Sequence, residues 1–256
     1  MVMTKDSFVS MCREAEDMPG EFTDNIQMCF ITRFARGCFE EGKEIVKEPS
    51  SEKKRAFTKE EKRLFLVTAK VMGYRWYFLF LLYFQTGCRR GELLALQWED
   101  VDFINKRITI DKSIGRGDVH GKRVEYLGDT KTEASNRTIP ISMKNMLILQ
   151  LSYEKMKPCP AEFVFKPKDG AVYKWVSLST VNRVFAEIRD RAGLDRNLTL
   201  HCIRHTFATE LIAAGVDTPT VQKLGGWSTP KTLLGIYAHS NDESARNALE
   251  KVMFRR

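Results

Sequence analysis

The chain has 256 residues, enough for one large domain or for one domain with a smaller appendage. A composition of 43% hydrophobic and 29% charged residues is that of a soluble globular protein, and the longest apolar run, WYFLFLLYF at 76–84, is too short to span a membrane. The formal net charge of +8 favours a polyanionic partner such as nucleic acid.

The first residues, MVMTKDSFVSMCREAED, are polar and acidic, unlike a secretory signal peptide. The six cysteines form no CxxC pair and no pattern typical of a disulfide framework, so we interpret them as reduced thiols. Both features predict a cytoplasmic protein that does not contact a membrane.

The composition changes near residue 50. Before it, a helical pattern runs through 22–46, with one apolar stripe formed by Ile26, Cys29, Phe30, Phe34 and Cys38. Residues 47–56, KEPSSEKKRA, are polar and contain Pro and Ser, as is typical of a linker. Thr58 then opens a capping box with Glu61, which predicts the first helix of a second region.

The second region is expected to be mainly α (α+β). The capping box precedes KRLFLVTAKVMG, and a hydrophobic helix follows to Thr86. Gly87 interrupts it, and RRGELLALQWEDV begins the next helix. Around 106–141 the segments KRITID, KRVEYLG and SNRTIPIS predict a small antiparallel sheet. GRGDVHG at 115–121 opens no helix, so it is interpreted as a flexible connection between strands. After 142 the pattern is helical again, through TPKTLLGIYAHS and a last helix in the C-terminal tail.

Two histidines four residues apart, His201 and His205 in HCIRHTFATE, share one face of a predicted helix, as a zinc-binding pair would. The glutamate that acts as base in such zinc helices is absent, because Cys202 takes its place. Arg204 would also repel a divalent cation. An arginine and a histidine three residues apart form a donor cluster suited to a phosphate, and His205 is expected to pack inward.

Four further residues have the chemistry that such a phosphate site needs. Arg89 stands at a helix start, where backbone N–H groups favour an anion. Lys131 is expected at the turn of a hairpin, and Trp227 and Tyr237 lie ten residues apart in LGGWSTPKTLLGIYAHS. Taken singly, the two cations could be surface charges, Trp227 a core aromatic and Tyr237 a half-buried helical residue.

In this order the motifs TG-x-R, KT-x-x-S-x-R, H-x-x-R-H-T-F-A-T, LGGWS and IYAH resemble the tyrosine recombinase, or phage integrase, family over residues 56–240. By position, Arg89 and Arg204 match the two catalytic arginines and Lys131 the hairpin lysine. Tyr237 matches the nucleophile and His201 the first histidine of the third motif. Trp227 stands where most members have His and some have Trp, and Glu92 matches an acidic supporting residue.

The resemblance implies site-specific DNA recombination through a 3′-phosphotyrosine, for the integration and excision of a phage or an integrative element, without metal or cofactor. It further implies a partial helical core-binding region at 1–47, a linker at 48–56 and a catalytic domain at 57–256. The implied partners are double-stranded DNA, a homotetramer on two duplexes, and accessory DNA-bending or excision proteins. Whether Tyr237 acts in its own subunit or a neighbour's stays open.

Two alternatives remain at this point. A type IB topoisomerase would use the same chemistry to relax DNA, although the integrase-like pattern at 22–46 argues against it. A DNA-binding module that has lost catalysis is the other alternative. The full set of six candidate catalytic residues speaks against that module; they are Arg89, Lys131, His201, Arg204, Trp227 and Tyr237.

Overall fold

The computed structural model describes residues 55–129, 136–167 and 170–229. These residues all lie in the second of two compact units, Met1–Ser50 and Ser51–Arg256, into which the chain divides. Several predictions therefore fall outside the described residues: the helical pattern of 22–46, most of the linker, Lys131, Tyr237 and the C-terminal helix.

Two helices open the described unit. The capping box predicted for the first is confirmed, because the Thr58 hydroxyl accepts from the Glu61 N–H at 3.1 Å and the Glu61 carboxylate accepts from the Thr58 N–H at 2.9 Å. The helix α3 (Lys59–Met72) ends at Gly73, whose φ of 142° is outside the helical region, and α4 (Tyr74–Thr86) follows at once. The two helices pack against each other, and the hydrophobic helix predicted to end at Thr86 is confirmed as α4.

A short three-stranded antiparallel sheet follows. It is preceded by the helix α5 (Arg90–Leu94) and a 3₁₀ turn, η1 (Trp98–Asp100). The strands β1 (Val101–Asp102), β2 (Arg107–Ile110) and β5 (Arg137–Pro140) lie in the order β1-β2-β5. Ile108 pairs with Ile139, and both side chains are buried. The predicted pairing of KRITID with SNRTIPIS is confirmed as β2 and β5, with β1 as an additional strand. The third predicted strand, KRVEYLG, does not belong to this sheet but to a separate two-stranded one.

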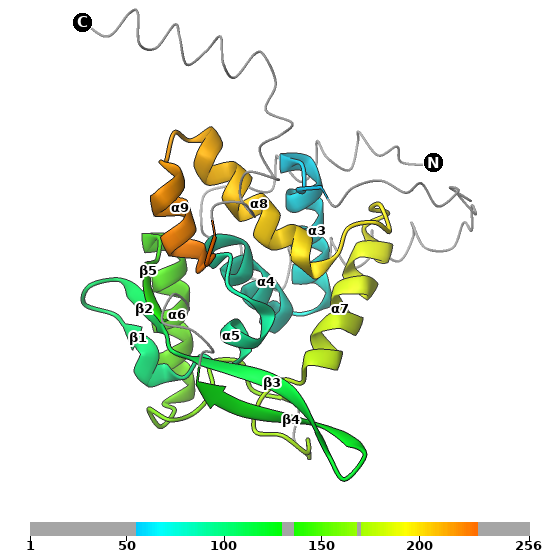
Figure 1. Ribbon diagram of the computed structural model, residues 1–256, viewed down its shortest axis with the longest axis vertical. Helices are drawn as coiled ribbons and strands as arrows, with labels where there is room; N and C mark the ends of the chain where they lie inside the picture. The colour runs from blue at the N-terminus through cyan, green and yellow to red at the C-terminus, as the bar shows by residue number, and fades with distance from the viewer. Residues whose placement is uncertain (1–54, 130–135, 168–169, 230–256) are drawn as a thin grey trace, which may run out of the picture. The chain divides into compact units, whose positions relative to one another are not determined.

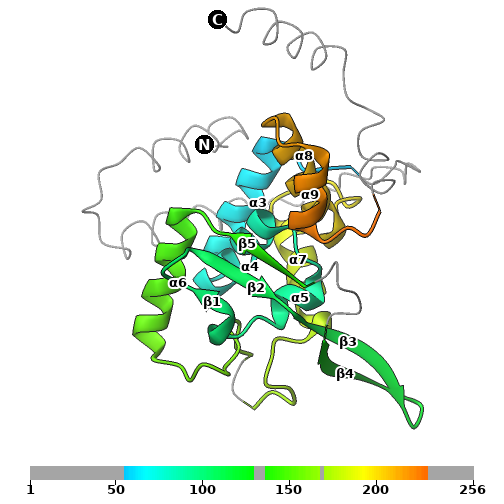
Figure 2. The same ribbon diagram turned by 60° about the vertical axis from the view of Figure 1, so that its left-hand side comes forward.

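Between β2 and β5 the chain forms a separate hairpin of β3 (Lys112–Val119) and β4 (Lys122–Asp129), which projects from the helices (Figures 1 and 2). The interpretation of 115–121 as a flexible connection is wrong, because residues 115–119 belong to β3. Only His120 and Gly121 form the turn, with φ of 50° and 75°, the positive values of a type I′ hairpin. The ring of Tyr126 covers Gly115 and Gly117, which explains how glycines are accommodated in this strand.

After β5 the named elements of the described unit are all helices, as predicted. Its helices are α6 (Met143–Met156), α7 (Leu178–Arg191), α8 (Leu200–Ala213) and α9 (Thr218–Gly225). Helix α8 packs against α4 and α9, and α9 lies beside β5. This arrangement brings the end of α4, the start of α8 and the end of α9 together. Among the helices of the described ranges, none is long and apolar enough to cross a membrane.

Candidate active site

Arg89 is positioned by the break between α4 and α5. Gly87 ends α4 in the left-handed conformation, with φ of 55°, and a Cβ atom there would lie 2.2 Å from the Phe207 ring. The chain can therefore turn only with glycine at this position. Arg89 is the N-cap residue of α5, as the sequence predicted, and its side chain is 46% exposed. The turn thus presents a guanidinium group at the molecular surface.

Glu92 holds Arg89 in place. Its buried carboxylate accepts from the Arg89 side chain at 2.7 Å and from the Arg89 backbone N–H at 2.8 Å. Burial alone would raise the pKa of Glu92, but the hydrogen bond and charge of Arg137, together with the bonds from Arg89, keep this pKa below its ordinary value. Glu92 is therefore ionised at neutral pH.

Arg204 and Trp227 form the other side of the cluster. The Arg204 side chain is buried, donates to the Gly87 carbonyl at 2.6 Å, and lies 4.0 Å from the centre of the Trp227 ring. Burial, and then the positive charge of Arg89, lower the pKa of Arg204 to about 10. It stays protonated at neutral pH, so the site holds a second, largely desolvated cation next to Arg89.

Two glycines allow Trp227 to fold back onto this cluster. A Cβ atom on Gly225 would lie 1.7 Å from the Trp227 ring, and Gly226 has φ of 68°, in the left-handed region. The Gly226 carbonyl accepts from the Arg89 side chain at 2.9 Å. The Leu224–Trp227 turn, residues 224–227, is therefore tied directly to Arg89.

His201 lies one turn before Arg204 on α8 and is exposed. Its ring contacts that of His205 edge to face, with centroids 4.6 Å apart, and His205 is half-buried rather than fully inside. Within the described ranges, no group of three His, Cys, Asp or Glu side chains could hold a metal ion. The structure thus brings together four of the predicted site residues, Arg89, Glu92, Arg204 and Trp227. His201 lies on α8, the helix that carries Arg204. Lys131 and Tyr237 are outside the described residues.

Sequence reasoning missed Arg137, the last residue of the motif KT-x-x-S-x-R. Its side chain is 2% exposed and donates to Glu92 at 2.8 Å and to the Leu224 carbonyl at 2.7 Å. An arginine at the start of a predicted strand carries no local signal of burial. The available signal was its place in the motif KT-x-x-S-x-R.

The cluster carries an excess of positive charge. Three guanidinium groups (Arg89, Arg137 and Arg204) and one carboxylate (Glu92) give a formal charge of +3 − 1 = +2. Such an arrangement attracts an anion, and planar guanidinium groups bind the oxygens of a phosphate well. The site can therefore hold a phosphate and stabilise additional negative charge on it.

Comparison with known proteins agrees with this chemistry. Residues 55–244 match the model of the phage integrase family. The chain belongs to this family, the tyrosine recombinases. It is 32% identical over 192 residues to a XerC-like tyrosine recombinase of Caldanaerobacter subterraneus subsp. tengcongensis, covering 70% of this chain and 49% of that protein.

Other relatives come from mobile elements. The integrase of Staphylococcus phage L54a is 26% identical over 174 residues, covering 65% of this chain and 48% of that protein. The present chain thus spans about half the length of the curated relatives it matches. Its fold is that of the Tn1549 transposon integrase, solved in complex with transposon right end DNA, with a TM-score of 0.67, 21% identity and coverage of 96% of this chain and 94% of that one.

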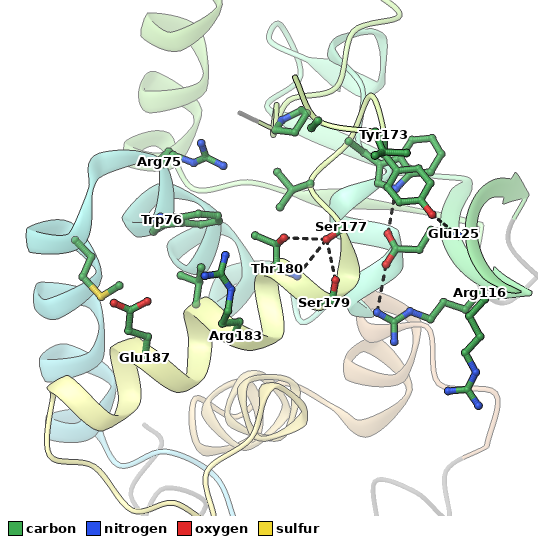
Figure 3. Close-up of a pocket in the computed structure, with 18 residues that line it drawn as sticks. Arg75, Trp76, Arg116, Glu125, Tyr173, Ser177, Ser179, Thr180, Arg183 and Glu187 are labelled. Carbon is green, nitrogen blue, oxygen red and sulfur yellow. Dashed lines mark hydrogen bonds and ion pairs between the residues drawn. The ribbon is translucent and has the colours of Figure 1, made fainter. Parts of the chain in front are cut away.

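The chain also has a basic pocket of about 660 Å³ beside α7, lined by none of the cluster residues (Figure 3). Its lining includes four arginines and two glutamates, a formal charge of +4 − 2 = +2: Arg75, Arg116, Arg123, Arg183, Glu125 and Glu187. The Glu125 carboxylate is occupied by protein donors: it accepts from the Leu178 N–H at 3.0 Å, the Trp175 indole at 3.3 Å and Arg116 at 3.2 Å. These bonds fasten the β3–β4 hairpin to α7 and leave a positively charged lining, which suits a polyanion.

Proposed function

We propose that this chain is the catalytic part of a site-specific DNA recombinase that cuts and rejoins DNA through a 3′-phosphotyrosine intermediate. Its proposed role is the integration and excision of a phage or an integrative element. The observation that carries the proposal is the cluster of Arg89, Arg137, Arg204 and Trp227 around the buried Glu92 carboxylate, with two positive charges in excess. Membership of the phage integrase family supports the same function.

Tyr237 is the proposed nucleophile. Its phenolic oxygen attacks the phosphorus of a DNA phosphodiester, and the bond between phosphorus and the 5′ oxygen breaks as the bond to tyrosine forms. The 5′ oxygen takes up a proton and leaves as a hydroxyl. Because the phosphotyrosine retains the energy of the phosphodiester, a 5′ hydroxyl of another strand can attack it and release Tyr237. Neither energy input nor a cofactor is needed for this exchange.

The other candidate residues divide the remaining tasks. Arg89, Arg204 and the Trp227 indole N–H are proposed to hold the non-bridging oxygens and to offset the charge that develops on them. Lys131 is proposed to protonate the departing 5′ oxygen, and His201 to assist proton transfer at the tyrosine. Glu92 orients Arg89 and does not react itself.

The proposed partner is double-stranded DNA, bound by a homotetramer that holds two duplexes and that accessory DNA-bending or excision proteins assist. Three observations support DNA as the partner: the net charge of +8, the basic cluster and the basic pocket. The Tn1549 integrase was solved in complex with transposon right end DNA.

Strand exchange between two duplexes tests this function. The duplexes carry the DNA repeats that flank the gene, with different lengths and labels on their outer ends. A recombinase yields products in which these outer ends are exchanged. Relaxation of plasmids that lack the repeats, without exchanged products, would instead indicate a type IB topoisomerase. DNA binding without any covalent adduct would indicate a binding module.

The same reaction is expected to proceed in excess EDTA, because guanidinium groups supply the positive charge at the phosphate that a divalent cation supplies in other enzymes. The yield of covalent adduct on a nicked, labelled duplex, measured on a denaturing gel, should match that without chelator. Loss of the adduct in EDTA and its return with zinc or magnesium would contradict this prediction and revive a metal site at His201 and His205.

Arg204→Ala is expected to slow adduct formation by about 10²–10³, the typical effect of removing one donor to the transition state. DNA affinity should fall as well, because the same guanidinium group contacts the phosphate in the bound state. Lys144→Ala removes a positive charge from the exposed face of α6 and serves as the charge-matched control. Equal adduct rates for both variants would remove Arg204 from the catalytic set.

A further inference from the structure

Arg137 connects three elements of the integrase-family chain. It lies at the start of β5, its guanidinium group reaches Glu92 on α5 at 2.8 Å, and its Nε donates to the carbonyl of Leu224 on α9 at 2.7 Å. The same group lies 3.6 Å from the buried Cys88 sulfur. With a side chain 2% exposed, it is enclosed by the site and has no open face for DNA.

The contacts of Arg137 and Arg89 are complementary. Both donate to Glu92, and both donate to carbonyls of the Leu224–Trp227 turn, Arg137 to Leu224 and Arg89 to Gly226. A Cβ atom on Gly226 would lie 2.7 Å from the Arg137 guanidinium, so the turn is closely fitted to this group. One carboxylate and one turn are therefore clamped between two arginines, of which only Arg89 is substantially exposed.

We propose that Arg137 is a positioning residue of the candidate active site: its buried guanidinium group holds Glu92 and the Leu224–Trp227 turn, and thereby fixes the orientation of Arg89 and Trp227. The role rests on the proposed function, because it concerns the geometry of that site. Arginine suits it because one planar fork serves a carboxylate and a carbonyl at once, whereas the single ammonium of lysine cannot span both.

A buried carboxylate makes this role measurable. The charged or titratable groups that face Glu92 are Arg89 at the start of α5, Arg137 on β5, Arg204 on α8, and the Cys88 and Tyr83 side chains. Burial favours the neutral form of Glu92, and Arg137 is the main group that opposes it. Without Arg137, we expect the pKa of Glu92 to rise above its value in the unfolded chain.

The sign of the resulting pH dependence distinguishes positioning from a general structural role. In the native chain the depressed pKa of Glu92 contributes stability at neutral pH that is lost on acidification. In Arg137→Met the pKa of Glu92 is raised, so Glu92 contributes stability in acid. This stability is lost as the pH rises towards 8. Each pKa unit corresponds to about 3–5 °C in the melting temperature of a unit of this size.

Thermal unfolding without DNA is therefore measured between pH 5 and pH 8 for the native chain, Glu92→Gln, Arg137→Met and the double variant. At pH 8 we expect Glu92→Gln to lower the melting temperature of the native chain but to raise the melting temperature of Arg137→Met. At pH 5 the increase in the Arg137→Met background should vanish. The control cycle is Arg107→Met with Asp102→Asn, an exposed pair on the same sheet, and should show no change of sign. Identical effects of Glu92→Gln in both backgrounds would overturn the proposal.

Adduct formation on the nicked duplex is the second readout. Arg137→Met should lower the rate roughly 10²-fold, the cost of a displaced catalytic group, with little loss of DNA affinity. Its rate should fall further as the pH drops from 8 to 6. Arg137→Lys should remove this additional acid sensitivity and recover part of the rate. An unchanged rate in Arg137→Met would overturn the positioning role. Absence of adduct with the native chain would instead contradict the proposed function. In that case the melting experiment would still test the contact between Arg137 and Glu92.

Discussion

Replacing Tyr237 with phenylalanine is expected to abolish the covalent protein–DNA adduct while leaving DNA affinity nearly unchanged. Only the hydroxyl is lost, and that hydroxyl supplies the oxygen that bonds to phosphorus. The aromatic ring and every candidate phosphate contact remain, so binding is preserved. The measurement pairs a denaturing gel of the nicked, labelled duplex with a filter or mobility assay of affinity.

Tyr74→Phe is the matched control, because Tyr74 is a tyrosine 53% exposed on α4 and its variant also loses one hydroxyl. It should form the adduct at the native rate. An adduct formed by Tyr237→Phe would show that another residue is the nucleophile, and the match of IYAH to the family motif would then fail at its most important position.

Lys131→Ala is expected to slow cleavage of ordinary DNA by roughly 10²–10⁴, the contribution of a positioned general acid. The reason is that a 5′ alkoxide is a poor leaving group unless it is protonated. If the bridging 5′ oxygen is replaced by sulfur, the leaving group is a thiol with a pKa of about 8.5, which departs as a thiolate without a proton. On 5′-thio DNA, Lys131→Ala should therefore cleave nearly as fast as the native chain.

Arg89→Ala provides the contrast. Its proposed task is to offset charge on the non-bridging oxygens, which sulfur at the bridging position does not relieve, so it should gain no rate on 5′-thio DNA. Comparable defects of Lys131→Ala on both substrates would make Lys131 a binding residue. The general acid would then have to be sought elsewhere, with His201 as the next candidate.

Local signals in the sequence predicted much of the fold. The capping box of Thr58 and Glu61, the stop at Gly87 and the four helices α6 to α9 depend on neighbours a few residues away, and the structure has each of them. The helices predicted after residue 229 lie outside the described residues. Residues 115–119 were misjudged because glycine usually weakens a strand, and here the Tyr126 ring covers the glycines from the opposite strand.

The candidate site was predictable only in part. Arg89, Glu92, Arg204 and Trp227 could be selected because they stand in recognisable motifs, and the structure brings them together. The role of Arg137 depends on contacts with residues 45 and 87 positions away in the chain, which no local pattern reveals. The pairing of Gly225 with the Trp227 ring likewise needs the folded turn to be seen.

Mass spectrometry of the adduct tests the central claim most directly. The chain is incubated with a nicked duplex that carries a flanking repeat, then denatured and digested with protease and nuclease. We predict a peptide containing Tyr237 that is linked to a nucleotide through its 3′ phosphate, with a free 5′ hydroxyl on the released strand. A nucleotide attached to another residue, or joined through a 5′ phosphate, would contradict the account.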